Sequence, residues 1–554
     1  EEPARQMPAL IAGAGELITN TGTAVDAAIS PDGTRVATVM RVGSQYQLSV
    51  VHLPTRGTIQ LGEPTDARLY GLTISPDGNY VYFVEEPPIT GASTLMRVSI
   101  GGGTPQRMLT GIETAVTFSP QADRLAYVRD GSEPGVRELV VASADGSNPQ
   151  ALSTTSGQQL FVAEGPSWSP DGQSIACSVM DSSAGFRHFV GLVQVADGRL
   201  SPLTDFDWFY VGRVQWLADG TRILVSAAKE SLGSMQLWEI TYPAAQVRPV
   251  RADLNSNDGV SLSADMRSLV TVRTSLPTSL WVATTQGGAD AQQLPTGITR
   301  YYGVSWTPDG RLIYSSSARG TPDIWIADSD GQNARQLTFF DSIERDPVMS
   351  GDGRFVFFSS NRAGTFNIWR TNADGSDPRQ ITFGLDDAFP SCTGDGELVV
   401  FQGYQDRRPV VMTVGGDGGQ PTQIGPAMAK WPSISPDGQW IACTVLNPDT
   451  GGWNCVLLPV TGRAEPRYVA DLPMLTIPRL FWQRTVWSDD SQTLHFLEDK
   501  RGTTYIRAVG IGRGSESDIA SFPSQKVLSY DVQNGLLACS LVSATSDIVL
   551  VTEF

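Results

Sequence analysis

Acidic residues just before short apolar segments are the first candidates for chemistry in this sequence. Two carboxyl groups about 5 Å apart, or about 6.5–9.5 Å apart, can hydrolyse a glycosidic bond. The chain has 58 Asp and Glu against 40 Lys and Arg, a net charge of −18, so most acidic loop residues are expected to be solvated. Glycoside chemistry therefore stays an alternative, and its candidate carboxylates are Asp205, Asp207, Asp258, Glu344, Asp346, Asp386 and Asp387.

Aromatic and basic residues occur in the same segments and favour binding over catalysis. Aromatic side chains and Arg carry much of the binding energy at protein interfaces, and aromatic rings also stack on sugars. We therefore predict a ligand-binding surface. Its ten predicted residues are Trp208, Tyr210, Arg213, Tyr302, Arg345, Asp346, Asp387, Phe389, Trp431 and Arg484.

The sequence contains no motif for serine hydrolysis or for metal binding. A Gly-x-Ser-x-Gly nucleophile motif does not occur. The three His residues, His52, His188 and His495, fall in different segments and are not expected to share a metal. The Asp-rich turn at Asp328 has Phe339 where a calcium-binding EF-hand loop has Glu. We predict no catalytic residue, no metal and no cofactor.

A repeated segment must position these side chains. The tetrapeptide Ser-Pro-Asp-Gly begins at four places, and degenerate copies extend the series to twelve at spacings of 42 to 53 residues. This period is typical of four-stranded propeller blades. The complete copies begin at Ser30, Ser75, Ser169 and Ser435; the degenerate ones begin at Ser119, Leu217, Ser263, Thr307, Ser350, Thr393 and Ser488, and a last lies near Gln533.

Residues 301–340 illustrate one repeat. Short alternating strands are expected at 302–306, 311–315, 323–327 and 335–338, separated by turns rich in Pro, Asp and Gly. We name these four strands a, b, c and d. Trp recurs at the end of strand a and on strand c, and Cys177, Cys443 and Cys539 occupy matching positions. Recurrence at one position predicts packing between neighbouring blades rather than a ligand or disulfide role.

The predicted fold is all-β, with two tandem propellers of twelve repeats, six blades in each, or seven and five as the alternative. Four to eight blades is the usual range for one ring. Residues 16–19 read as a strand d without a preceding a, b or c, and residues 547–554 as a strand c without a following d. We place an N-terminal extension at 1–14, the first propeller at 15–286 and the second at 287–554, with the break near Gly287 and each ring closing its last blade with its own first strand.

Composition restricts the partners. An acidic chain, with a pI near 4.6, lacks the basic face that nucleic acids require, so no nucleic acid is expected. No apolar run of about 18 residues occurs, so no membrane span is expected in this chain. The first residue is Glu1 rather than Met, from which we expect a processed chain.

The repeat resembles the TolB-like repeat of bacterial β-propellers. The resemblance is clearest from Val304 to Phe383 and extends over nearly the whole chain. It implies the propeller fold and, by analogy with TolB, protein binding at a channel mouth; it says little of activity. The residues that carry it are Ile324-Trp325, Asp330-Gly331, Gln336-Leu337-Thr338, Ile368-Trp369, Asp374-Gly375 and Gln380-Ile381-Thr382.

Four further segments are similar to the C-terminal region of bacterial receptor-type serine/threonine kinases, notably those of acidobacteria. The resemblance implies a sensor region outside the cytoplasm and a possible membrane-anchored kinase upstream. The kinase signatures themselves do not occur in this sequence. The similar segments are 27–33, 211–216, 253–256 and 546–550.

We therefore expect a non-enzymatic binding, sensor or scaffold protein on the periplasmic or extracellular side of a bacterial envelope. Its partner would be a protein or peptide, or else a glycan, held at a channel mouth. A carbohydrate-active enzyme using acidic residues at the same mouth is one alternative. A structural subunit of an envelope complex is the other.

Overall fold

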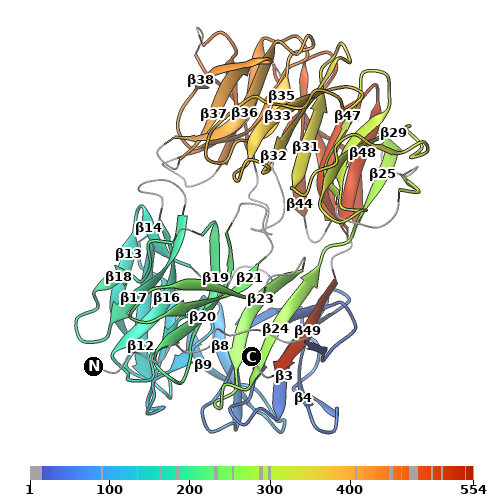
Figure 1. The fold of residues 1–554 in the computed structure, drawn as a ribbon. Helices are drawn as coiled ribbons and strands as arrows, with labels where there is room; N and C mark the ends of the chain where they lie inside the picture. The colour runs from blue at the N-terminus through green and yellow to red at the C-terminus, as the bar shows by residue number, and fades with distance from the viewer. Residues whose placement is uncertain are drawn as a thin grey trace. The chain divides into compact units, whose positions relative to one another are not determined.

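The structure is a computed structural model in which all regular secondary structure of the described residues is β (Figure 1). It describes residues 15–88, 91–133, 135–162, 164–181, 187–206, 208–229, 235–251, 255–285, 291–296, 301–405, 408–447, 453–462, 465–472, 484–500, 503–512, 516–523, 525–542 and 545–552. The predicted N-terminal extension, 1–14, and Gly287 lie outside these residues.

The predicted four-strand repeat is confirmed. In the sheet of residues 301–336 the strands run β27 (Tyr301–Trp306), β28 (Leu312–Ser316), β29 (Asp323–Ala327) and β30 (Arg335–Gln336), each antiparallel to the next. Strand a therefore lies at one edge of the sheet and strand d at the other.

Hydrogen bonds explain why Ser-Pro-Asp-Gly recurs between strands a and b. The Gly33 N–H donates to Ser30 O (2.9 Å), and Gly33 has a φ of 70° that favours glycine. The Ser30 hydroxyl donates to Asp32 Oδ1 (2.5 Å) and accepts from the Arg35 N–H (2.9 Å). The Ser30 hydrogen bond lowers the pKa of Asp32. Ser and Asp thus close the turn with their side chains.

A second motif, Gln-Leu-Thr, ties strand d to strand c. Thr338 Oγ1 accepts from the Ile324 N–H (2.9 Å), and Gln336 Nε2 donates to Asp323 Oδ2 (2.9 Å). The next repeat uses Thr382 in the same way, accepting from the Ile368 N–H (3.0 Å). These bonds hold a strand d of only two residues in place.

The chain divides into two compact units. Unit 1 consists of residues 1–275 and 544–554, and unit 2 of residues 276–543. The described residues form six sheets in each unit, and all have four strands except one with five. One blade for each sheet, six in each ring, stays our prediction.

The strands of unit 1 are β1 (Glu16–Leu17), β2 (Ala24–Ile29), β3 (Arg35–Val42), β4 (Gln45–His52), β5 (Thr58–Gln60), β6 (Arg68–Ile74), β7 (Tyr80–Glu86), β8 (Thr94–Ser99), β9 (Gln106–Thr110), β10 (Thr117–Phe118), β11 (Arg124–Asp130), β12 (Val136–Ser143), β13 (Gln150–Ser156), β14 (Gln159–Phe161), β15 (Ser167–Trp168), β16 (Ser174–Asp181), β17 (Arg187–Gln194), β18 (Leu200–Pro202), β19 (Tyr210–Trp216), β20 (Arg222–Ala228), β21 (Gln236–Thr241), β22 (Val247–Arg251), β23 (Ser256–Leu262), β24 (Ser268–Ser275) and β49 (Thr545–Thr552).

The strands of unit 2, besides β27 to β30, are β25 (Thr278–Thr284), β26 (Gln292–Gln293), β31 (Glu344–Met349), β32 (Phe355–Ser360), β33 (Asn367–Asn372), β34 (Arg379–Gln380), β35 (Ala388–Cys392), β36 (Leu398–Gln405), β37 (Arg408–Gly415), β38 (Gly418–Ile424), β39 (Ala429–Ile434), β40 (Trp440–Leu446), β41 (Trp453–Pro459), β42 (Arg467–Leu472), β43 (Val486–Trp487), β44 (Thr493–Lys500), β45 (Thr503–Gly510), β46 (Glu516–Pro523), β47 (Lys526–Gln533) and β48 (Leu536–Val542).

The two closing sheets differ from the prediction. The chain leaves unit 1 after strand b of the sixth repeat, β24, rather than after strand c. In Figure 1 the C-terminal strand β49 lies beside β24, and its other edge pairs with β1. Strand β25 instead pairs with β48 and β26 in unit 2.

The division of the chain is therefore at Ser275 rather than 286, and residues 544–554 belong to unit 1 rather than to the second propeller. The reason is that the two exchanged c strands are alike. Both begin with Thr-Ser and carry mostly apolar residues after it, at Thr278–Thr284 and, following Asp547, in Thr545–Thr552. Sequence period alone does not select which strand b each one joins. Unit 2 is in effect inserted between strands b and c of the last sheet of unit 1.

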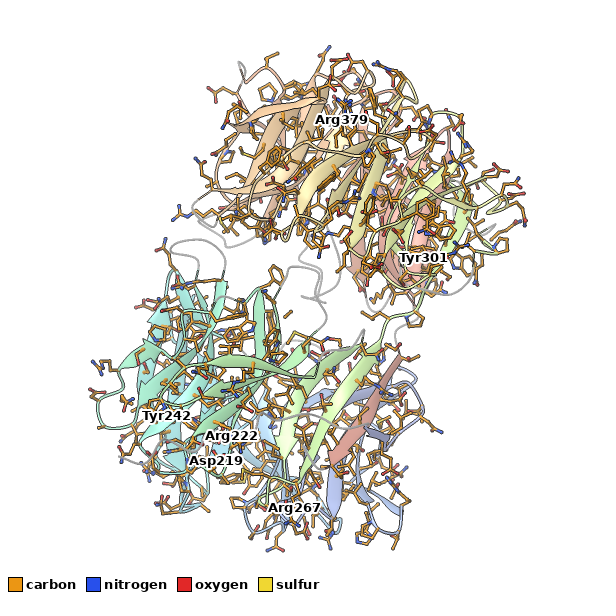
Figure 2. The ribbon with its side chains drawn as sticks, viewed as in Figure 1. Asp219, Arg222, Tyr242, Arg267, Tyr301 and Arg379 are labelled. Carbon is orange, nitrogen blue, oxygen red and sulfur yellow. The ribbon has the colours of Figure 1, made fainter. Side chains whose placement is uncertain are left out.

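Packing between neighbouring sheets forms the core, as the recurrence of Trp and Cys predicts. Trp306 and Tyr301 are 6% and 0% exposed and pack with Tyr314 in one such layer. Figure 2 labels Tyr301 within unit 2; its hydroxyl donates to Thr296 O (2.9 Å). Cys177, Cys443 and Cys539 are buried and free, as expected.

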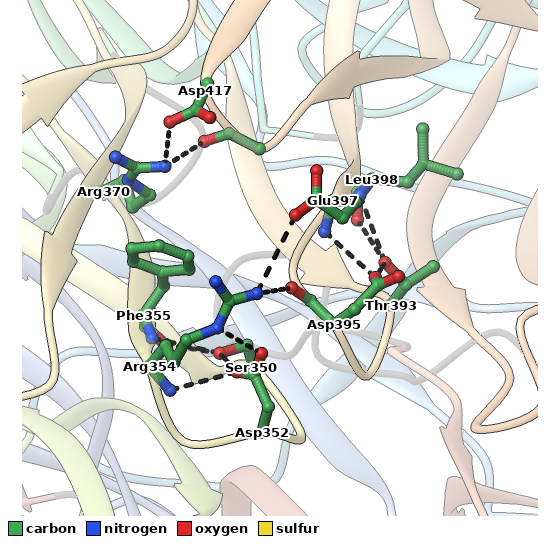
Figure 3. A network of polar contacts seen from close by, with 11 residues as sticks. Ser350, Asp352, Arg354, Phe355, Arg370, Thr393, Asp395, Glu397, Leu398 and Asp417 are labelled. Atoms are coloured by element: carbon green, nitrogen blue, oxygen red, sulfur yellow. Dashed lines mark hydrogen bonds and ion pairs between the residues drawn. The ribbon is translucent and has the colours of Figure 1, made fainter.

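Turns of neighbouring sheets are also cross-linked by polar contacts in unit 2. Arg354 Nε donates to Asp352 in its own turn (2.5 Å), and Arg354 Nη2 donates to Asp395 O in the next sheet (3.0 Å). Between the same two sheets, Arg370 on β33 pairs with Asp417, which lies between β37 and β38 (Figure 3). These contacts connect the turns of two neighbouring sheets.

Candidate functional site

One position of strand a recurs in every sheet, four residues before the first residue of the a–b turn; we call it the ring position. In unit 2 the first strands β27, β31, β35, β39, β43 and β47 contact one another in a closed cycle, so the ring positions face a common centre. The residues there are Gly303, Asp346, Phe389, Trp431, Arg484 and Ser529 in unit 2, and Asp26, Gly71, Ala115, Gly165, Arg213 and Gly259 in unit 1.

The backbone at the ring position bulges out of the ladder. The a–b register shifts between Arg345 and Val348, and the same shift occurs in the neighbouring sheets. Asp346, Phe389 and Trp431 have φ values of 56°, 58° and 51°. A bulge of this kind re-aims one side chain, and three predicted binding residues, Asp346, Phe389 and Trp431, lie at it.

Asp346 is the most perturbed carboxyl at the centre of unit 2. Its side chain is 2% exposed, and burial raises its pKa to about 7, although the Arg345 and Arg484 charges act in the opposite direction. Arg345 Nε lies 3.6 Å from Asp346 Oδ2. The Arg345 guanidinium also lies 3.7 Å from the ring centroid of Phe366. Asp346 is thus a buried carboxyl group that lies beside the positive charge of Arg345.

Two further titratable groups belong to this region. Burial lowers the pKa of Lys430 to about 8, and its Nζ lies 4.7 Å from the ring centroid of Trp453 and 5.6 Å from that of Trp431. Asp531 Oδ2 accepts from the Trp306 N–H (2.7 Å), and burial raises the pKa of Asp531 to about 6. The centre of unit 2 therefore combines aromatic rings with charges of both signs.

The centre of unit 1 is bridged from one side to the other. Arg213 Nη2 donates to Leu72 O (2.8 Å), and Arg213 Nη1 lies 3.9 Å from Asp26 Oδ1. Asp26 Oδ2 in turn accepts from the Leu72 N–H (2.8 Å), and burial raises the Asp26 pKa. A Cβ on Gly71 would lie 3.0 Å from Ala115 N, so its neighbours leave no space. Arg213 acts as a structural bridge here.

Exposed apolar side chains occur on two successive d–a loops of unit 2. Phe339, Phe340, Phe383 and Leu385 are 69%, 41%, 78% and 75% exposed. Their loops connect β30 to β31 and β34 to β35, in neighbouring sheets. We call these four residues the exposed loop pair. A group of this kind marks an interaction site on soluble proteins more often than a single exposed residue does.

Acidic residues at the start of the following strand fix both loops. Glu344 is fully buried and pairs with Arg362, whose guanidinium lies 3.7 Å from the Phe340 ring centroid. In the second loop, the Gly384 N–H donates to Asp387 Oδ2 (3.1 Å). A Cβ on Gly384 would lie 2.4 Å from Asp387 Oδ1. Both carboxylates thus position apolar residues toward solvent.

The ten predicted residues occupy different places in the two units. Asp346, Phe389, Trp431 and Arg484 share the ring position of unit 2, and Arg345 adjoins it. Arg213 holds the ring position of unit 1 as a bridge, and Asp387 fixes a loop. Tyr302 is half-buried next to the ring position at Gly303. The remaining two, Trp208 and Tyr210, belong to unit 1.

Trp208 is a core residue, contrary to its predicted binding role. It is 1% exposed, packs on Phe206 with ring centroids 4.7 Å apart, and pairs its backbone with His188. Tyr210 is half-buried, and its hydroxyl donates to Glu164 (2.6 Å). The d–a loop of this sheet turns its large aromatic ring inward, because a pocket of apolar neighbours from the adjacent sheets receives it.

Four other predicted binding residues are also buried. Arg345, Asp346, Asp387 and Phe389 are 2%, 2%, 4% and 2% exposed. The exposed loop pair is not among the predicted residues. A usable signal was present: an aromatic residue directly follows the Leu-Thr or Ile-Thr of the d strand in two successive repeats, at Phe339 and Phe383.

Within the described residues, no group of three His, Cys, Asp or Glu side chains is placed to hold a metal ion. In the same part of the chain, no helix is long and apolar enough to cross a membrane.

Comparison with protein families gives one match. The sequence profile of the TolB beta propeller domain matches residues 277–428. These residues belong to unit 2 and include the exposed loop pair. No curated protein shows significant sequence similarity to the chain.

Several solved structures are similar to the chain at low sequence identity. A TolB protein from Agrobacterium tumefaciens is 16% identical with a TM-score of 0.40; 48% of this chain and 99% of that one are covered. The tricorn protease is 13% identical with a TM-score of 0.33, covering 92% and 54%. A GH74 enzyme from Niastella koreensis is 10% identical with a TM-score of 0.36, covering 93% and 90%.

Proposed function

We propose that this chain is a non-enzymatic, extracytoplasmic binding protein that takes a protein or peptide partner at the exposed loop pair of unit 2. The exposure of Phe339, Phe340, Phe383 and Leu385 on two neighbouring loops carries the proposal. The TolB beta propeller match over residues 277–428 supports a binding role and an envelope-side location.

The chemistry of the loops suggests the chemistry of the partner. Asp341 is exposed and Asp386 is half-buried, one in each loop, beside the apolar side chains. The whole chain carries a net charge of −18. A partner segment with apolar side chains flanked by Lys or Arg would bury the rings and gain favourable charge contacts.

The carboxylates considered for glycoside chemistry already have structural roles. Glu344 pairs with Arg362, Asp387 accepts from the Gly384 N–H, and Asp346 lies buried beside Arg345. These engagements favour binding over glycoside hydrolysis. A sensor role linked to a kinase stays a prediction.

A peptide display screen tests the proposal. We expect the intact chain to select peptides with aromatic or aliphatic residues next to Lys or Arg. The variant Phe339→Ser/Phe383→Ser/Leu385→Ser should lose at least ten-fold in affinity for them. The control Val42→Ser/Ile59→Ser changes exposed apolar residues of unit 1 and should bind as the parent does.

Two outcomes would overturn the proposal. One is equal binding of the selected peptides by the parent and the loop variant. The other is turnover of a glycan substrate that stops on Asp346→Asn or Asp387→Asn, which would establish the carbohydrate-active alternative.

A further inference from the structure

A separate pocket in unit 1 lies between two neighbouring sheets at their a–b turns. It encloses about 300 Å³, at the small end of the range for small-ligand sites. One wall is the turn that begins at Ser169, and the other is the turn after Trp216. The lining residues are Ser169, Pro170, Asp171, Ser174, Trp216, Ala218, Asp219, Gly220 and Tyr242.

Two aromatic rings form one side of this pocket. Trp216 and Tyr242 meet edge to face, with ring centroids 5.1 Å apart at 78°. Trp216 is 5% exposed and Tyr242 is 36% exposed, so the tyrosine ring reaches solvent. The Tyr242 N–H donates to Thr221 O (2.7 Å), which fixes its backbone against the turn. Figure 2 shows Tyr242 close to Asp219 and Arg222 in unit 1.

Carboxylates supply the charge of the pocket. Asp171 Oδ1 accepts from the Ser169 hydroxyl (2.6 Å) and from the Gln173 N–H (2.9 Å), so Oδ2 takes no part in the turn. Asp219 is paired with Arg222 at 2.7 Å. The Arg222 charge is thus already neutralised within the protein. Asp171 leaves a net negative charge beside the two rings.

The preceding pair of sheets, which meet at the turn that begins at Ser119, has a side chain of the protein in the corresponding space. There Trp168 occupies the same position at the end of strand a as Trp216 does, and the Arg124 guanidinium lies 4.9 Å from the Trp168 ring centroid. Arg124 is the fifth residue after Ser119, and Ser174 is the fifth after Ser169. At the pocket, therefore, a small Ser stands where the adjacent sheet has Arg.

We propose that the pocket binds the guanidinium group of a ligand between the exposed ring of Tyr242 and Asp171, in the place that the Arg124 side chain takes between the preceding pair of sheets. Cation–π contact with the phenol ring of Tyr242 and ionic contact with Asp171 would both favour a planar cation. The guanidinium belongs either to a small free molecule or to an Arg side chain of a peptide. The proposal is independent of the binding surface in unit 2.

Titration calorimetry of the full chain with N-acetyl-arginine amide tests the proposal. We expect binding that the neutral isostere N-acetyl-citrulline amide reproduces at least ten-fold more weakly. Ser174→Arg, which supplies an internal guanidinium, should abolish binding. Asp171→Asn should weaken it by about five-fold or more. Asp265→Asn changes the same turn position in another sheet of unit 1, where Leu262 stands in place of Trp, and should have no effect.

Equal binding of the arginine and citrulline compounds, or no binding of either, would overturn the proposal. So would unchanged affinity in Asp171→Asn, which also decides the case if Ser174→Arg does not fold by circular dichroism. An Arg residue within a short Ala peptide separates the two sources: tighter binding than that of the free amide indicates a peptide ligand, and equal or weaker binding a small molecule.

Discussion

The d–a loops of the two units begin with the same motif and end differently. In unit 1, Leu203-Thr204 leads to Phe206 and Trp208, which pack inward, and Trp208 is 1% exposed. In unit 2, Leu337-Thr338 and Ile381-Thr382 lead to Phe339 and Phe383, which are 69% and 78% exposed. An aromatic residue after this motif is therefore core in one unit and surface in the other, and neighbouring side chains decide which.

The ring positions differ in the same sense. Four of the six ring positions in unit 1 are Gly or Ala. The other two are Arg213 and Asp26; Arg213 donates to Leu72 O and lies close to Asp26. Unit 2 instead places Phe389 and Trp431 there, with Asp346 and Arg484. The ring positions of unit 1 thus hold mostly small residues and one charged pair, whereas those of unit 2 include two aromatic residues.

The largest expected effect comes from removing the inward ring of unit 1. Trp208→Ala should destabilise unit 1 by about 3–5 kcal/mol, because a fully buried aromatic side chain is replaced by a cavity. Urea denaturation followed by circular dichroism measures this. A loss below about 1 kcal/mol would contradict the core role of Trp208.

The bridge across the centre of unit 1 comes next. Arg213→Ala should cost about 3 kcal/mol at pH 7, because it leaves the Asp26 carboxylate buried without its counter-charge. Because burial raises the pKa of Asp26, its protonated form needs no partner, and the loss should shrink as pH falls to 5. A pH-independent loss would mean that the hydrogen bond to Leu72 O, rather than the charge, matters.

The buried carboxyl of unit 2 should make stability depend on pH. The pKa of Asp346 is about 7 in the folded chain and near 3.9 when unfolded. The folded state therefore binds the proton more tightly, and stability falls as pH rises from about 4 to 7. Asp346→Asn removes this dependence, so its stability relative to the parent should rise by about 2 kcal/mol between pH 5 and pH 8. Denaturation of both proteins at four pH values measures the difference, and parallel curves would contradict it.

The smallest effect on stability is expected at the exposed loop pair. Phe383→Ser should change the free energy of unfolding by less than about 0.5 kcal/mol, because its ring contacts mostly water. The same variant should weaken binding of peptides selected by the parent chain. A stability loss comparable to that of Trp208→Ala would show that the loop ring is packed, and would remove it from the proposed surface.

Local pattern was sufficient to predict the repeat and its strand order. In the complete copies of the a–b turn, the Ser, Asp and Gly bond within five residues of one another, as at Ser30 to Arg35. Such contacts are encoded in consecutive residues. Candidate site residues were harder to predict: Asp346, Phe389, Trp431 and Arg484 share one position in the repeat, but the period does not reveal the backbone bulge at Asp346, Phe389 and Trp431.

The sequence by itself determined an all-β chain of twelve like modules, because each module carries its own turn chemistry and apolar alternation. Only the tertiary structure decided which strand closes which unit, because β25 and β49 have similar sequence patterns. Each pairs with a strand hundreds of residues away, β25 with β48 and β49 with β24. The tertiary structure also decided which aromatic side chains are buried. Whether Trp208 or Phe383 meets solvent depends on the side chains that a neighbouring sheet presents, and no local segment contains that information.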